Sequence, residues 1–349
     1  MADQPKSLSY RDAGVDIDAG NEAVRRIRSL VASTRRPEQL DDIGGFAGMI
    51  GLPSGMKTPV LVSCADGVGT KLLVAIAAGV HDTVGIDLVA MNVNDLICTG
   101  ARPLFLLDYI ATGALKPGIV ESIVAGIVDG CRQSGCALLG GETAELPGMY
   151  SEGHYDLAAF AVGVVDKDSR LNPKSVQPGD VAIGVLSSGL HSNGYSLARR
   201  ALLDPEFGGL ALHDTFPGTE SSVADVLLTP TRVYVKAVAA ALSVGGVSSA
   251  AHITGGGLLE NPPRALPDGT TVEIDLSAIP PTPIFDAISA QGVTQQEMLR
   301  TFNYGVGMML FTAPDAVDTV ITALEGAGES AVRMGRVVAS QGAAGVRFV

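Results

Sequence analysis

Hydrophobic residues along this chain occur in two alternating patterns. Short continuous apolar runs, such as residues 60–64 and 181–186, predict buried strands. Stripes spaced three and four residues apart, such as Val24, Ile27 and Val31, predict amphipathic helices. The predicted strands cover residues 60–64, 104–110, 137–139, 157–165, 181–186, 272–276, 305–312 and 332–338. The predicted helices cover residues 20–34, 72–78, 83–99, 117–134, 193–203, 231–242 and 315–326.

Proline and glycine residues mark where several of these elements begin and end. Pro117 opens the clearest helix and Gly135 follows its last turn, which is the usual order of the two residues at helix ends. Residues 35–57 are rich in glycine and are typical of a long functional loop. Residues 168–180 combine proline, glycine and polar side chains, so they are the best linker candidate. We predict an α/β (α+β) chain of two mixed-sheet domains, residues 1–170 and 171–349.

The overall composition narrows the class of protein. The 349 residues are enough for two domains with a core each. Apolar residues make up 46%, which excludes a fully disordered chain. The net charge of −13 argues against a basic surface for nucleic acid. The 43 glycines have no collagen period and indicate many tight turns and close backbone approaches.

No segment of the sequence indicates export or a membrane. The first residues lack the layout of a signal peptide, and no apolar run approaches the roughly 18 residues of a membrane span. The cysteines are too few for a disulfide scaffold, so we expect buried thiols: Cys64, Cys98, Cys131 and Cys136. We therefore expect a cytoplasmic protein with no nucleic-acid and no membrane partner.

The segment Asp66-Gly-Val-Gly-Thr-Lys71 joins a predicted strand to a predicted helix. Gly67 and Gly69 permit close backbone approach, and a helix N-terminus offers free N–H groups to an anion. Lys71 could meet a phosphate and Asp66 a metal. An ordinary tight turn before a capped helix explains the same residues about equally well. The order of residues is neither that of a Walker A loop nor that of a dinucleotide fingerprint, which counts against an oxidoreductase.

The predicted helix 83–99 contains no Lys, Arg or Glu. Its Asp87, Asn94 and Asp95 share one side of the helix together with Met91. Burying such carboxylates is costly, so they need either a metal or donors from Arg or the backbone.

Residues 140–145, Gly-Gly-Glu-Thr-Ala-Glu, come directly after a predicted strand. Glu142 and Glu145 would then emerge at the carboxyl end of that strand, where open α/β sheets bind ligands. A surface loop with solvated glutamates is the alternative.

Two further segments carry hydroxyl, amide and imidazole groups next to glycines. Residues 187–195, Ser-Ser-Gly-Leu-His-Ser-Asn-Gly-Tyr, lie between a strand and a helix, which suits a phosphate monoester. Residues 251–261 contain three consecutive glycines that would let the backbone contact a ligand. His252 in this segment is more often a satisfied structural histidine than a catalytic one.

In this order the segments resemble the phosphoribosylformylglycinamidine cyclo-ligase family, the aminoimidazole ribonucleotide synthetases. Residues 10–21 and 302–308 belong to the same series, so the resemblance covers nearly the whole chain. It implies an ATP-dependent ring closure with Mg²⁺, in which formylglycinamidine ribonucleotide gives aminoimidazole ribonucleotide, ADP and phosphate. It also implies a homodimer formed through an N-terminal ATP-binding domain, and a C-terminal substrate-binding domain.

On this resemblance we assign roles to the candidate residues. The hypothesis places Asp66, Asp95 and Glu142 on Mg²⁺, with Asp87 and Asn94 in support. It makes Lys71, His191 and Asp66 the catalytic residues. His191 would be the general acid or base, since an unperturbed pKa of about 6.5 suits proton relay. The residues expected to contact ATP are Gly44, Gly45, Phe46, Gly67, Gly69, Thr70, Lys71, Asn94 and Thr143, with residues 44–48 as a lid. The residues expected to contact the substrate are Ser187, Ser188, Gly189, His191, Ser192, Asn193, Gly255, Gly256 and Gly257.

Related ATP-using enzymes are the nearest alternatives. Selenophosphate synthetase needs a reactive cysteine in its N-terminal glycine-rich loop, whereas the first cysteine here, Cys64, lies in a predicted strand. Thiamine-phosphate kinase and formylglycinamidine synthase also remain. A nucleotide-binding protein without turnover is the alternative from another class.

Overall fold

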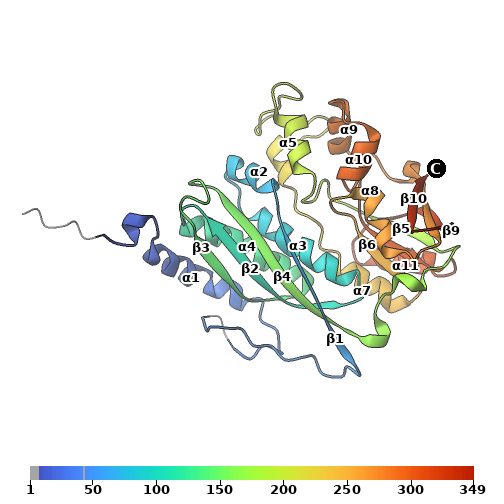
Figure 1. The fold of residues 1–349 in the computed structure, drawn as a ribbon, viewed down its shortest axis with the longest axis horizontal. Helices are drawn as coiled ribbons and strands as arrows, with labels where there is room; N and C mark the ends of the chain where they lie inside the picture. The colour runs from blue at the N-terminus through green and yellow to red at the C-terminus, as the bar shows by residue number, and fades with distance from the viewer. Residues whose placement is uncertain (1–7, 42–43) are drawn as a thin grey trace, which may run out of the picture.

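Two β-sheets and the helices packed on them organise the chain, shown here as a computed structural model that describes residues 8–41 and 44–349 (Figure 1). The first sheet has the order β1-β4-β2-β3. Its strands are β1 (Pro59–Gly67), β2 (Arg102–Thr112), β3 (Ala137–Glu145) and β4 (Tyr155–Asp166). Strands β2 and β3 run parallel, and β4 pairs antiparallel with both β1 and β2.

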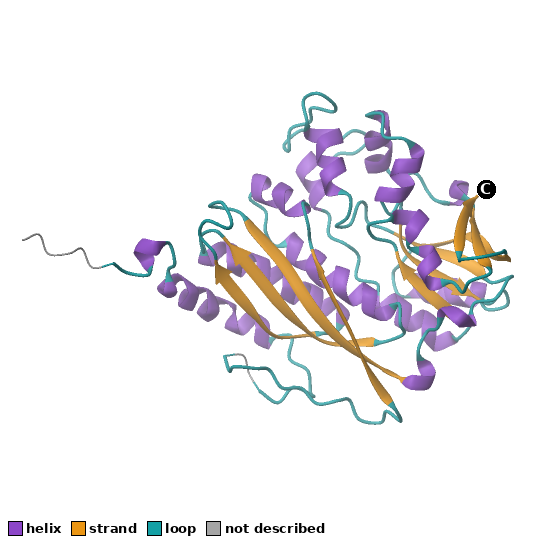
Figure 2. Ribbon diagram, viewed as in Figure 1, coloured by secondary structure: helices purple, strands orange, loops and turns teal. Residues whose placement is uncertain are grey.

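Within residues 8–41 and 44–349, helices cover one face of this sheet and leave the other face without a helix. In Figures 1 and 2 the helices α3 (Thr83–Ile97) and α4 (Pro117–Ser134) lie behind the four strands, and α1 (Ile17–Ala32) packs beside α4. Along β4, Leu157, Ala159 and Ala161 are buried under these helices, whereas Phe160 on the other face is 53% exposed. Leu61 of β1 is 60% exposed as well. The sheet therefore has one face packed and one face open.

The second sheet has six strands in the order β10-β7-β9-β5-β8-β6. Its strands are β5 (Val181–Leu186), β6 (Val247–His252), β7 (Thr270–Ile274), β8 (Val306–Thr312), β9 (Ala331–Ala339) and β10 (Gly345–Phe348). The remaining α-helices are α2 (Lys71–Ala78), α5 (Tyr195–Leu203), α6 (Val223–Leu228), α7 (Val235–Val244), α8 (Gly257–Glu260), α9 (Pro283–Ala290), α10 (Gln295–Thr301) and α11 (Val317–Gly326). A single apolar core joins Leu88 and Val89 of α3 to Ile183 of β5 and Met308 of β8.

The structure confirms the predicted class of an α/β chain with two mixed sheets. Strand β5 has the predicted bounds, and Gly135 follows α4 in the left-handed conformation expected of a helix end. The domain boundary near residue 170 falls between the last strand of the first sheet and the first strand of the second, and it stays a prediction. Within residues 8–41 and 44–349, no helix is long and apolar enough to cross a membrane.

Several details of the sequence prediction were wrong, and α6, α8, α9, α10 and β10 were not predicted. Strand β3 continues through Glu145, so residues 140–145 are not a loop, because their pairing with β2 holds them extended. Helix α7 begins at Val235, and the backbone N–H groups of Thr231 and Tyr234 before it bond to side chains of α3. Strand β6 was missed, since its sequence Val-Ser-Ser-Ala-Ala-His has no apolar run.

Close contact between α3 and α4 depends on glycine and gives a first prediction. A Cβ added at Gly126 would lie 1.7 Å from the carbonyl oxygen of Asp82, so Gly126→Ala must push the helices apart. We expect the free energy of unfolding in urea to fall by about 1–3 kcal/mol. Gly118→Ala, in the same helix and with nothing within 4 Å, is the matched control and should leave stability unchanged or slightly higher. Equal effects of the two changes would contradict the packing argument.

Candidate functional site

A buried ion pair joins the two halves of the molecule. Lys71, the first residue of α2, places its Nζ 2.7 Å from Asp87 Oδ2 on α3, and both side chains are fully buried. The same Nζ donates hydrogen bonds to the carbonyl oxygens of His191 at 2.9 Å and Thr229 at 2.7 Å. Asp87 Oδ1 accepts from the backbone N–H and the hydroxyl of Thr231. Burial lowers the pKa of Lys71 and raises the pKa of Asp87, and the charge of each partner opposes that shift in the other.

This arrangement contradicts three of the roles expected from the sequence. An ammonium group has three N–H donors, and all three of Lys71 are used inside the protein, so none remains for a phosphate oxygen. Asp87 is fully buried, with Oδ1 held by Thr231 and Oδ2 against Lys71, so it belongs to this ion pair and does not support a metal. Asn94 is buried and bonds the carbonyl of Arg232 and the N–H of Tyr234, so it does not contact ATP. These residues hold the halves together.

The loop 66–70 and the loop 187–194 lie against each other. Ser192 donates its hydroxyl to the carbonyl of Val68 at 2.7 Å, and the hydroxyls of Thr70 and Ser196 are 3.0 Å apart. Gly69 and Thr70 are exposed at this junction. The structure therefore brings together a segment expected to bind ATP and a segment expected to bind substrate.

Hydroxyl and amide groups inside the second loop fix its shape. Ser187 donates to the carbonyl of Gly189 at 3.0 Å, and Ser188 donates to the carbonyl of Pro230 at 2.7 Å. Asn303 donates to the same Gly189 carbonyl at 2.8 Å. The hydroxyls of Ser187, Ser188 and Ser192 thus already have acceptors within the protein.

A third loop, which contains the glycines 255–257, lies next to Asn193 at the same junction. A Cβ at Gly255 would lie 3.5 Å from Asn193 Oδ1, and Gly255 itself is exposed. Gly256 has a φ of +100°, and a Cβ at Gly257 would collide with the carbonyl of Leu299. Gly255 is therefore the glycine of this run that can present its backbone to a ligand.

His191 lies in a buried position. The ring is 1% exposed, and its Nε2 accepts a hydrogen bond from the backbone N–H of Ser188 at 3.2 Å, so the proton of the neutral ring is on Nδ1. A Cβ at Gly307 would lie 2.4 Å from His191 Cε1, so glycine is needed beside the ring. Burial holds the pKa of His191 well below its usual value. The expectation of an unperturbed pKa near 6.5 was wrong.

Two neighbouring carboxylates, Asp66 and Asp95, lie where β1 ends and α3 passes beneath it. Asp66 accepts from the N–H of Gly67 at 2.8 Å, and Asp95 Oδ1 lies 2.9 Å from His252 Nδ1. Burial, with a contribution from the charge of Asp95, raises the pKa of Asp66. In the described part of the chain neither carboxylate pairs with Lys or Arg. Mg²⁺ is commonly held by one or two carboxylates together with phosphates and water, so this donor set fits the ion.

Glu142 is not part of that pair. It lies on β3, at the opposite edge of the sheet from β1, and two strands at about 4.8 Å spacing intervene. The strand register pairs Glu142 with Tyr109, and Tyr109 lies in line with Gly67. The side chains of Glu142 and Asp66 therefore lie on opposite faces of the sheet. No group of three or more His, Cys, Asp or Glu residues in ranges 8–41 and 44–349 is placed to hold a metal ion. One chain therefore does not assemble the expected set of three carboxylates.

Gly44, Gly45 and Phe46 also lie at the β3 side of the sheet. A Cβ at the neighbouring Gly48 would collide with Leu139 of β3, so the loop rests on that strand. Phe46 is fully exposed. Beside this loop a cavity of about 440 Å³ is lined by Arg25, Arg28, Ser29, Val31, Ala32, Arg35 and Gln39. Thr143 is on the same strand, so the expected ATP contacts fall into two groups at opposite sheet edges.

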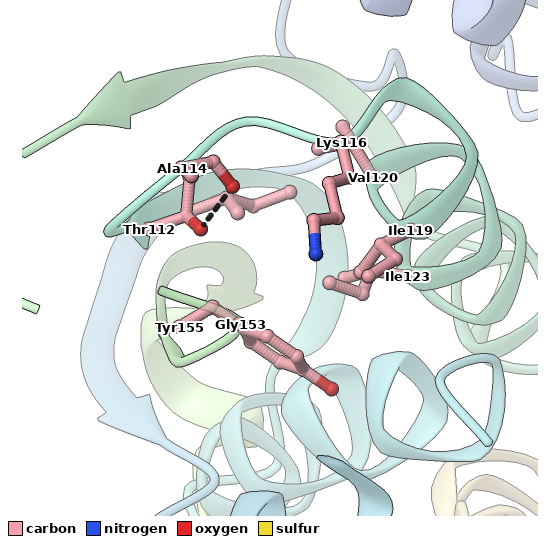
Figure 3. Close-up of a pocket in the computed structure, with 9 residues that line it drawn as sticks. Thr112, Ala114, Lys116, Ile119, Val120, Ile123, Gly153 and Tyr155 are labelled. Carbon is pink, nitrogen blue, oxygen red and sulfur yellow. Dashed lines mark hydrogen bonds between the residues drawn. The ribbon is translucent and has the colours of Figure 1, made fainter. Parts of the chain in front are cut away.

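A smaller cavity lies between the end of β2 and the start of α4 (Figure 3). Lys116 and Tyr155 reach toward it, among apolar side chains such as Ile119 and Val120. Tyr155 shares a hydrogen bond of 2.9 Å with His81 Nδ1. The enclosed volume is about 10 Å³, room for one water molecule, so this cavity does not take a substrate.

The sequence placed Glu145 at a ligand-binding strand end and did not single out Asp108, whereas the structure gives each carboxyl group a defined environment. Glu145 accepts from the N–H of Asp16 and of Leu115, both at 2.6 Å, and so ties the N-terminal segment to β3. Asp108 lies on the packed face of β2, and burial raises its pKa to about 7. The sequence signal that could have identified Asp108 is an acidic residue inside the apolar run 104–110.

Comparison with known proteins places this fold and site in a family. The N-terminal domain of the AIR synthase related proteins matches residues 47–165, and the C-terminal domain of that family matches residues 177–347. The chain belongs to the AIR synthase related protein family.

Its relatives give a more particular likeness. A phosphoribosylformylglycinamidine cyclo-ligase from Sorangium cellulosum is 54% identical over 335 residues, 95% of this chain and 96% of the relative. A cyclo-ligase of the same name from Geotalea daltonii is 53% identical over 332 residues, 95% of each chain. The resemblance inferred from the motifs is confirmed.

Solved structures of more distant proteins share the fold. Thiamine-monophosphate kinase from Stenotrophomonas maltophilia has a TM-score of 0.68 at 22% identity, covering 93% of this chain and 95% of that one. Hydrogenase maturation protein HypE in complex with ATP has a TM-score of 0.64 at 18% identity, covering 93% and 91%. At these identities the likeness concerns the fold alone.

The three N–H donors of Lys71 are used by partners inside the protein, and this leads to a second prediction. Lys71→Met leaves Asp87 buried without its counter-charge, so the free energy of unfolding should fall by about 3–5 kcal/mol in a denaturant titration. Lys71→Met/Asp87→Asn should regain part of that loss, because Asn can still accept from Thr231. Lys236→Met, at an exposed position, is the control. Loss of ATP binding by Lys71→Met at unchanged stability would instead support a phosphate contact.

Proposed function

We propose that this chain catalyses the reaction for which its relatives are named. Formylglycinamidine ribonucleotide and ATP give aminoimidazole ribonucleotide, ADP and phosphate, a step of purine biosynthesis. The observation that carries this assignment is the 53–54% identity, over about 95% of the chain, to relatives that share one name. The chain is accordingly an ATP-dependent ligase that closes a ring.

The chemistry needs a leaving group on the formyl carbon. Transfer of the γ-phosphoryl group of ATP to the formyl oxygen creates that leaving group. The amidine-side nitrogen then attacks the same carbon, the C–O bond breaks, phosphate leaves, and loss of a proton completes the ring. Phosphoryl transfer depends mainly on positioning and on neutralising charge at the γ-phosphate.

We assign the phosphates to the junction of the two halves. Exposed backbone at Gly69 and Thr70, next to Gly67 and ahead of α2, offers N–H groups to phosphate oxygens. Asp66 and Asp95 would hold Mg²⁺, which supplies charge neutralisation at the transferring phosphoryl group. Asn193 and Gly255 lie at the same junction and would contact the substrate. His191 then acts as a neutral residue that shapes this loop, since its pKa is lowered by burial.

The division of the expected ATP contacts supports a homodimer. Glu142, Thr143 and residues 44–46 lie at the β3 edge, whereas Asp66 and Gly67 lie at the β1 edge. Packing of two copies through the open faces of their first sheets would bring the β3 edge of one copy toward the β1 edge of the other. It would also cover Leu61 and Phe160.

We further propose a cytoplasmic location. Cys64, Cys98, Cys131 and Cys136 are all free thiols, as expected in a reducing compartment, and the proposed substrates are small phosphorylated metabolites.

The assigned reaction gives a third prediction. Phosphate release should require formylglycinamidine ribonucleotide, ATP and Mg²⁺ together, and Asp95→Asn should lower it at least about 100-fold while the thermal midpoint stays within a few degrees. Asp268→Asn, at an exposed carboxylate just before β7 of the second sheet, is the control. Binding of ATP without phosphate release would favour a regulatory nucleotide-binding protein instead.

The open sheet face gives a fourth prediction. Phe160→Asp places a charge in the proposed interface, so sedimentation at micromolar concentration should show monomers where the unmodified chain is dimeric. Phe207→Asp, an equally exposed aromatic residue in another part of the chain, should remain dimeric. Monomers in the unmodified chain would refute the dimer.

A further inference from the structure

One hydrogen bond links the carboxylate pair to the second half of the molecule. His252 is the last residue of β6, and its side chain is 3% exposed. Its Nδ1 lies 2.9 Å from Oδ1 of Asp95 on α3, 157 residues away in sequence. Its other ring nitrogen, Nε2, is buried and has no hydrogen-bond partner in the described part of the chain. The bond to Asp95 is therefore the one polar contact that orients this ring.

The same bond also orients Asp95. The carboxylate is 42% exposed, so without a partner it could rotate freely in solvent. Donation from His252 Nδ1 fixes Oδ1 and leaves the second oxygen, Oδ2, available to a ligand. Hydrogen bonds of this kind from a neighbouring side chain commonly set the orientation of a metal-binding carboxylate.

His252 also belongs to the segment that carries the candidate substrate contacts. The next residue, Ile253, donates its N–H to Gly307 of β8, and Thr254 donates to the side chain of Asn261. These bonds hold the backbone that leads to Gly255. The ring of His252 thereby connects this segment to Asp95.

We propose that His252 is a positioning residue, which fixes Asp95 for Mg²⁺-ATP and ties that site to residues 253–257. This inference rests on the metal-binding role proposed for Asp95. The competing explanation is a purely structural role, in which His252 only holds the two halves together. The two explanations predict different metal affinities for variants that keep or lose the hydrogen bond to Asp95.

The test compares two replacements of His252. In His252→Asn the side-chain amide occupies the position of Nδ1 and can still donate to Asp95, whereas His252→Phe keeps a ring without a donor. Mn²⁺ serves as the probe, and its affinity in the presence of ATP is measured by electron paramagnetic resonance, with the thermal midpoint recorded for each variant. His252→Phe should weaken Mn²⁺ about 10–100-fold, and His252→Asn should stay within about threefold of the unmodified chain.

Three outcomes would overturn the proposal. Unchanged Mn²⁺ affinity in His252→Phe, with Asp95→Asn losing the ion, leaves the metal site standing and removes His252 from it. Equal weakening of Mn²⁺ binding in both His252 variants, with lower thermal midpoints, shows that His252 has a structural role only. Unchanged affinity in Asp95→Asn removes the metal site itself, and the role of His252 with it.

Discussion

The buried ion pair between Lys71 and Asp87 is the constraint on which the arrangement of the two halves depends. Each charge is out of water, so each must keep its partners in place. Lys71 reaches two carbonyls of the second half, and Asp87 accepts two donors from Thr231. Because these partners come from different loops, the pair fixes both loops against α3. The exposed backbone of Gly69 and Thr70 is placed by the same residues.

The chemistry at the junction is built from carboxylates and backbone, with few cations. All three donors of Lys71 are used inside the protein, and neither Asp66 nor Asp95 pairs with Lys or Arg in the part of the chain that is described. This explains how a chain with a net charge of −13 can handle phosphorylated ligands. A divalent ion would neutralise the phosphates, and N–H groups in glycine-rich turns would orient them. The arginine-lined cavity beside residues 44–46 is the exception, at the opposite sheet edge.

Local sequence could predict much of the fold and the location of the candidate segments. Helix α4 and strand β5 have strong apolar patterns, and the structure agrees with both. Strand β6 could not be predicted, because its small residues are extended only through pairing with β8. The role of Lys71 could not be predicted from the sequence either. The segment that contains it suits a phosphate site or a buried anchor, and the deciding partners lie 120 and 158 residues away.

Helix α3 has a consequence for how this fold can change during evolution. Three of its polar side chains bond groups of the second half: Asp87 bonds Thr231, Asn94 bonds Arg232 and Tyr234, and Asp95 bonds His252. A chimaera that takes its first half from one relative and its second half from another must therefore inherit α3 together with residues 229–234 and His252. Recombination at the linker alone separates these donors from their acceptors. The residues on both sides of the junction must therefore be inherited together, because neither half contains all of them.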